Sequence, residues 1–191
     1  NHTASKPYTY AEVSKYYDLK AVNEKLKKTA SSWWARKLWN ENMVEIQGED
    51  YWFTLNPIFD LQVGKASKSD VSYTYINTRG INFRGGLGKT LNFTTTVFES
   101  QGRFADYYNS YAESIRPAGG NPAIIPGVGI AKRFKTDAYD FPLAEANITY
   151  VPSKFFDFQL GYGRNFIGDG YRSLLESDGA SPYPYFKINT T

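Results

Sequence analysis

From residue 51 onward, apolar and polar side chains alternate with a period of two. In the first such run, mostly aromatic and aliphatic residues at the odd positions of 51–63 alternate with mostly polar residues at the even positions. The alternation returns at 81–87, 91–97, 144–150, 156–162 and 186–189. Because a strand directs successive side chains to opposite faces, the pattern predicts six strands, each with one apolar face.

The connections between these strands alternate in length. Long connections at 65–78, 102–140 and 166–184 are separated by short ones around Lys89 and Ser153. Membrane barrels are connected in this way, with tight periplasmic turns and long extracellular loops. A strand of about ten residues, tilted by about 40°, also spans the barrel's apolar band of about 25 Å. The sequence therefore predicts a mainly β fold, an antiparallel transmembrane β-barrel of the outer membrane.

Closure of such a barrel needs about eight strands or more. We therefore expect the six strands to be the N-terminal part of a larger barrel whose remaining strands are missing from this sequence. A soluble β-sandwich such as a lectin is the alternative, although its loops need not sort by length. In the barrel, Leu160 should face lipid, and Gln159 should face the lumen, where an arginine would be tolerated.

The residues before the first strand have helical rather than strand spacing. Thr9 and Glu12 have the spacing of a capping box, and the apolar positions after them run to Leu26. Ser32 can cap a shorter helix that contains three tryptophans and two basic residues in 33–39. The helices either pack on the rest of the domain or, for the tryptophan-rich one, lie in the headgroup layer. We divide the chain into a helical periplasmic segment, 1–48, and a barrel portion, 49–191.

Composition removes several classes of function. The chain has 17% aromatic residues, which suits the aromatic girdles of a barrel, and no run of 18 apolar residues that would predict a transmembrane helix. A net charge of +3 is too small to indicate nucleic-acid binding. With no cysteine and His2 as the only histidine, we expect no Ser–His or Cys–His nucleophile, no metal site and no cofactor. A carboxylate glycosidase in the loops is the weaker enzymatic alternative.

Two loop regions combine tyrosine, arginine and carboxylates, which suit sugar stacking and hydroxyl hydrogen bonds. Gly168 and Gly170 would give the last loop tight or positive-φ backbone. We expect Arg164 to point into the lumen, and charged residues of the last loop to form a network over it. The candidate residues for glycan contact or for this network are Arg103, Asp106, Tyr107, Tyr108, Arg164, Asp169, Tyr171, Arg172 and Asp178.

The segment 163–175, Gly-Arg-Asn-Phe-Ile-Gly-Asp-Gly-Tyr-Arg-Ser-Leu-Leu, stands at a strand-to-loop junction and is followed by Ser177-Asp178 and 181–184. With the stretches 6–13, 101–108 and 119–123, it resembles the Wzi-like capsule-assembly outer-membrane barrels. It is more similar still to their Bacteroidetes relatives, the RemB-like proteins of gliding motility.

The resemblance implies a longer barrel with helices near its periplasmic mouth and long extracellular loops. It implies a non-enzymatic protein of the cell surface that acts in gliding motility, adhesion or the handling of capsular polysaccharide. Its expected partners are outer-membrane lipid, surface polysaccharide, and a motility, secretion or barrel-assembly complex. An accessory subunit of an outer-membrane secretion or assembly complex is the alternative function.

Overall fold

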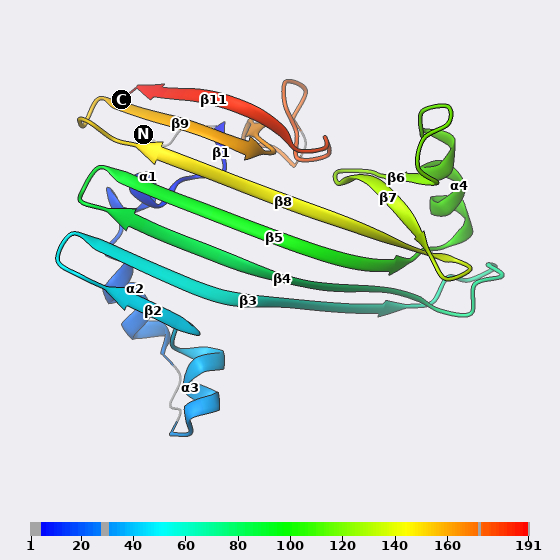
Figure 1. Cartoon of the computed structure of the whole chain (residues 1–191), viewed down its shortest axis with the longest axis horizontal. Helices are drawn as coiled ribbons and strands as arrows, with labels where there is room; N and C mark the ends of the chain where they lie inside the picture. The colour runs from blue at the N-terminus through cyan, green and yellow to red at the C-terminus, as the bar shows by residue number, and fades with distance from the viewer. Residues whose placement is uncertain (1–4, 28–30, 172, 191) are drawn as a thin grey trace.

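A computed structural model describes residues 5–27, 31–171 and 173–190. The fold is mainly β and antiparallel, and Figure 1 shows that its long strands form one twisted sheet. The six long strands are β3 (Tyr51–Gly64), β4 (Thr74–Leu87), β5 (Leu91–Arg103), β8 (Ala138–Tyr150), β9 (Phe156–Gly163) and β11 (Tyr183–Thr190). The six predicted strands are thus confirmed, and most are longer than the alternating runs indicated.

The long strands lie side by side in the order β11-β9-β8-β5-β4-β3, and all neighbours are antiparallel. A short strand, β2 (Val44–Gln47), extends the sheet beyond β3. Within the described residues the sheet does not close on itself, since β11 and β2 are its two edges. The strand β2 also shows that the predicted helical segment 1–48 contributes to the sheet.

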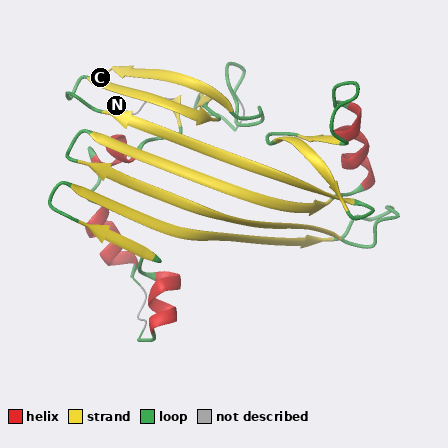
Figure 2. Cartoon of the chain, viewed as in Figure 1, coloured by secondary structure: helices red, strands yellow, loops and turns green. Residues whose placement is uncertain are grey.

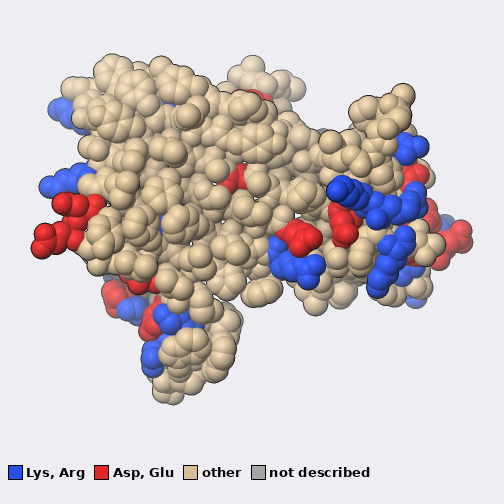
Figure 3. Space-filling view, in the orientation of Figure 1, with Lys and Arg blue, Asp and Glu red and all other residues tan. Residues whose placement is uncertain are grey.

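Register places the apolar side chains of all six strands on one face, the apolar face. At its centre, Ile81 of β4 lies opposite Pro57 of β3 and Val97 of β5. In the other half of the sheet, Leu160 lies opposite Ile148 and Phe186. The sheet face turned toward the viewer in Figure 3 has few charged side chains in its middle, and charges gather at the two ends of the strands.

The opposite face, the polar face, is covered at both ends by segments of the chain. At the end where the long loops lie, the connection after β5 forms α4 (Asp106–Ser114), β6 (Ala123–Ile125) and β7 (Gly129–Phe134). The apolar residues of this connection pack against side chains on the polar face at the loop end of β8. The buried cluster that results is Ala112, Ala123, Ile125, Ala131, Tyr139 and Phe141. The sequence predicts this connection, 102–140, only as a long loop. The three elements are too short for their periodicity to stand out in the sequence.

At the end with the short turns, the first N-terminal residues lie behind the sheet, and their last helix lies beyond the β2 edge (Figure 2). They form β1 (Ser5–Lys6), α1 (Tyr10–Ser14), α2 (Leu19–Leu26) and α3 (Trp33–Trp39). Strand β1 pairs with β10 (Phe166–Ile167), which follows β9. We call residues 5–15 the N-terminal strap, because they join the last loop to the turn end of the sheet.

Side-chain caps set the limits of these helices. The capping box of Thr9 and Glu12 is confirmed, and Ser32 caps α3 as predicted. However, the predicted helix from Thr9 to Leu26 is two helices, because the Asp18 side chain accepts from the backbone N–H of Ala21 and starts α2. None of the helices in the described ranges is long and apolar enough to cross a membrane.

Candidate functional site

The first group of predicted site residues lies at the loop end of β5. Arg103, the last residue of β5, forms an ion pair with Asp137 at 2.5 Å and lies over the Tyr73 ring, 4.8 Å from its centroid. These contacts hold the Arg103 side chain mostly out of solvent, with 17% exposed. Through the ion pair and the ring contact, Arg103 joins the end of β5 to the connection before β8 and to the connection after β3.

Asp106 begins α4 and binds the connection between β3 and β4. Its Oδ2 accepts hydrogen bonds from the Ser69 hydroxyl at 2.6 Å and from the backbone N–H of Asp70 at 3.1 Å. Asp106 is thus a loop-bracing carboxylate, whereas the sequence offered it equally for glycan contact. A carboxylate in the first helical turn also interacts favourably with the helix dipole.

Tyr107 and Tyr108, adjacent on α4, have opposite environments. The Tyr107 side chain is 79% exposed. Tyr108 packs its ring against Phe104, with centroids 4.6 Å apart, beside the buried cluster. Burial of the hydroxyl, with a smaller contribution from Tyr107, raises the pKa of Tyr108. Of this pair, Tyr107 is the residue that a ligand in solution can reach.

Arg164 lies at the start of the last loop and makes three contacts. Its Nε donates to Glu145 of β8 at 2.8 Å, and its Nη1 donates to the carbonyls of Gly127 and Asp178 at 3.0 and 3.3 Å. Because Glu145 belongs to the polar face, Arg164 lies on that side of the sheet, and its lumenal direction stays a prediction. Arg164 thus connects the two longest loops to the sheet, so its guanidinium mainly locks loops together.

The rest of the predicted charged network is placed differently. Asp169 and Tyr171 are exposed near the tip of the last loop, and Asp178 meets Arg164 through its backbone carbonyl. Arg172 lies outside the described residues. Gly168 has a φ of 143°, which favours glycine as predicted, whereas within the described part of the chain Gly170 has no positive φ.

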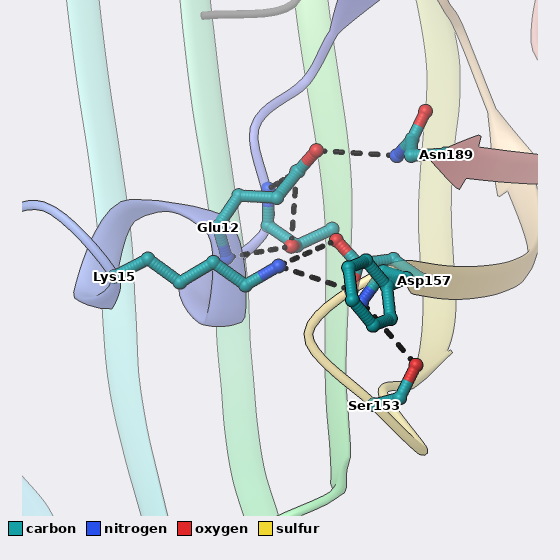
Figure 4. A network of polar contacts seen from close by, with 7 residues as sticks. Glu12, Lys15, Ser153, Asp157 and Asn189 are labelled. Carbon is teal, nitrogen blue, oxygen red and sulfur yellow. Dashed lines mark hydrogen bonds and ion pairs between the residues drawn. The ribbon is translucent and has the colours of Figure 1, made fainter. Parts of the chain in front are cut away.

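A contact network that the sequence did not predict fastens the N-terminal strap to the turn end of the sheet (Figure 4). Lys15 Nζ lies 3.2 Å from both carboxylate oxygens of Asp157, whose side chain is only 4% exposed. Asn189 Nδ2 donates to Glu12 Oε1 at 3.1 Å. The one available signal was Asp157 itself, a lone carboxylate on a strand face that needs a cation.

Next to this network lies a row of buried polar residues on three neighbouring strands. Gln159 of β9 pairs in register with Thr149 of β8 and with Lys187 of β11. Gln159 and Thr149 are each only 1% exposed. The prediction that an arginine would be tolerated at Gln159 is therefore not supported, because the chain itself covers this part of the polar face.

Two cavities lie near these groups. One of about 550 Å³ at the loop end is lined by residues that include Tyr75, Arg103, Tyr107 and Tyr108. The other, of about 420 Å³, lies between the N-terminal strap and the middle of the polar face. No group of three or more potential metal ligands among His, Cys, Asp and Glu occurs in the part of the chain that the structure describes.

Comparisons of this chain with protein-family models, with curated proteins and with solved structures found no match.

Proposed function

We propose that this chain forms part of a non-enzymatic β-barrel in the outer membrane, with its long loops outside the cell and its N-terminal segment on the periplasmic side. There it would act in surface adhesion, gliding or the handling of surface polysaccharide. The exposed apolar face of the sheet is the observation that carries this proposal.

The apolar face has no cover from the described residues. Along β3 alone, Phe59, Leu61 and Val63 are 81%, 73% and 78% exposed. Soluble monomers seldom expose continuous apolar patches larger than a few hundred Å², because each Å² removed from water contributes about 25 cal/mol. Hydrocarbon chains of a bilayer would cover this face and remove the apolar side chains of all its strands from water. Further strands pairing with the free edges would then complete the barrel.

Helix α3 supports the same orientation. Its Trp33, Trp34 and Trp39 are 48%, 66% and 61% exposed, and none of its residues is buried. It stands just before β2, which pairs with the turn-end half of β3. Tryptophan together with basic residues is favoured in the headgroup layer. An α3 lying in the periplasmic headgroup layer therefore fits a barrel whose short turns face the periplasm.

The loop end offers a surface for polysaccharide. The cavity of about 550 Å³ has three tyrosines in its lining, of which Tyr107 is the most exposed. Arg103 also lines it, and its Nε makes no hydrogen bond with a described residue. The exposed ring of Tyr107 suits the apolar faces of sugars, and its hydroxyl suits their hydroxyl groups.

Single cysteines can test the membrane orientation, because the chain has no native cysteine. Phe59→Cys and Asp60→Cys place a thiol-linked fluorophore on opposite faces of the same strand. In the full-length protein in liposomes, lipids with nitroxide on their acyl chains should quench the probe at 59 and spare the one at 60. Equal quenching at the two positions would refute the lipid-facing assignment.

The polysaccharide role has a separate test. Protein purified from cells that carry Tyr107→Ala should retain less surface polysaccharide than the native protein purified in the same way. Tyr111→Ala, a change on the same helix at a residue outside the cavity lining, is the matched control. Undiminished retention with Tyr107→Ala contradicts the loop-end site. Stoichiometric co-purification with other envelope proteins would instead favour an accessory subunit of a secretion or assembly complex.

A further inference from the structure

The cavity beneath the N-terminal strap lies on the polar face, away from the loop-end surface. Pro7, Tyr8 and Tyr10 of the strap line one side. Strands β4, β8, β9 and β11 line the other, through Arg84, Asn147, Gln159 and Tyr185. Its volume of about 420 Å³ is within the usual range for small-molecule sites. The strap and the sheet form most of it, together with Leu19 of α2 and Arg164 of the last loop, so the site does not depend on closure of the sheet into a barrel.

Gln159 indicates that the cavity is a built site. It is 1% exposed, and neither its amide oxygen nor its amide nitrogen makes a well-formed hydrogen bond with a described residue, although the Tyr185 hydroxyl lies beside it. Its register neighbours have the same property, since Thr149 Oγ1 and Lys187 Nζ are also buried without such a partner. Buried polar groups are nearly always hydrogen-bonded in folded proteins, and three unsatisfied ones in a single row are therefore a marked exception. A polar ligand in the cavity would satisfy Gln159.

The charges around the cavity indicate the sign of that ligand. Two arginines and one glutamate line it. Glu145 is already bound to Arg164 at 2.8 Å, so these two charges neutralise each other. Arg84 has no ion pair within the described ranges, and its charge is left for an anion. A guanidinium presents paired donors that match the two oxygens of a carboxylate.

The remaining lining groups add a second requirement. The Asn147 and Gln159 amides and the hydroxyls of Thr94, Thr96 and Tyr185 are all uncharged hydrogen-bonding groups. These uncharged donors and acceptors can pair with hydroxyl groups of a ligand, whereas a simple anion would leave most of them unused. We propose that this cavity binds a small carboxylate that carries several hydroxyl groups, about the size of a hexuronic acid. Arg84 binds its carboxylate, and Gln159 hydrogen-bonds its hydroxyls.

Calorimetric titration of the purified full-length protein in detergent tests this site, with D-glucuronate, D-glucose and acetate as the probes. Glucose replaces the carboxylate of glucuronate with a CH₂OH group, and acetate keeps the carboxylate without the hydroxyls. Only glucuronate should give saturable binding. No binding of glucuronate up to about 10 mM, above the weakest affinity expected of a specific site, overturns the proposal. Equal binding of glucose overturns the role of the carboxylate.

Two variants locate the binding. Arg84→Gln and Gln159→Leu should each weaken glucuronate binding by about tenfold or more, as expected when a hydrogen bond to a charged or buried group is lost. Arg84 is exposed, so Arg84→Gln should fold normally even if Gln159→Leu does not. Arg79→Gln, on the same strand but on the apolar face, is the control and should bind as the native protein does. Native affinity in Arg84→Gln would place the ligand elsewhere and refute the site.

Discussion

The two faces of the sheet are built from the same strands, but other segments of the chain cover only one of them. On the apolar face, side chains such as Phe59 and Leu61 contact only their strand neighbours and remain exposed. On the polar face, the chain supplies its own cover, with the strap at the turn end and the α4–β7 insertion at the loop end. The apolar face thus has no cover from the described chain, whereas the polar face is covered by the chain itself at both ends.

The difference separates what alternation can specify from what it cannot. A period of two assigns each side chain to a face, and both faces follow from it. It does not say which face another segment covers, because covering depends on contacts between residues far apart in the sequence. The contact between Lys15 and Asp157 joins residues 142 positions apart. Changes that affect one face only should therefore separate the two kinds of stability.

The largest effect is expected from a charge on the apolar face. Ile81→Arg, at the centre of the apolar face, should destabilise the protein in liposomes by about 2–4 kcal/mol, because an arginine near the middle of a bilayer loses its hydration. Guanidinium unfolding followed by tryptophan fluorescence measures the free energy of unfolding. Gln62→Arg, on the exposed polar side of the neighbouring strand β3, should cost little. Similar losses of unfolding free energy in the two variants would mean that both faces contact water, which would contradict the proposed difference between them.

The next effect is expected from the strap. Lys15→Met leaves the Asp157 carboxylate, 3% exposed, without its cation, and should cost about 1.5–3 kcal/mol. Lys27→Met breaks an exposed ion pair with Glu24 and should cost less than about 1 kcal/mol. An Asp157→Asn background should remove most of the Lys15→Met effect in a double-mutant cycle. A full effect in that background would show that Lys15 acts without Asp157.

The sequence predicts the apolar face in detail because every strand there shows the same alternation of apolar and polar residues. All six long strands, the face of each apolar residue and the two N-terminal caps follow from local pattern. Strand β2 was missed because its four residues, Val44–Gln47, are too few to show a period and directly follow a helix. Elements of this length take their structure from the neighbour they pair with rather than from their own residues.

The candidate site was predictable only in its composition. The sequence predicts Arg103, Asp106 and Arg164 only as polar residues near loops, and the structure shows that each holds loops together. Tyr107 keeps the exposure that a ligand contact needs. A one-letter pattern cannot distinguish an arginine that braces a loop from one that binds a ligand, since both need a charge at a strand end. The partner residues decide, and they come from distant segments.

A smaller effect is expected where the polar face meets the loops. Arg164→Met removes the contacts with Glu145, Gly127 and Asp178, and should destabilise the protein by about 1–2 kcal/mol, since the side chain is one-quarter exposed. Cleavage by a protease added outside the cell should become faster in 166–184. Arg133→Met, which breaks a more exposed ion pair with Glu113, is the control and should leave that cleavage rate unchanged. An unchanged rate in Arg164→Met would show that the last loop is held by other contacts.

The smallest effect is expected at the strap's own cap, and it sharpens the comparison most. Thr9→Ala removes the side-chain bond to the backbone of Glu12 and should cost about 0.5–1 kcal/mol, whereas Thr9→Ser should keep most of it. Ser32→Ala removes the equivalent bond in α3, a helix outside the strap. Hydrogen exchange of the amides in β11 should therefore increase with Thr9→Ala, because Glu12 also binds Asn189, and remain unchanged with Ser32→Ala. If both variants changed β11 alike, the two helices would be coupled, and the strap would not be the separate cover of the polar face.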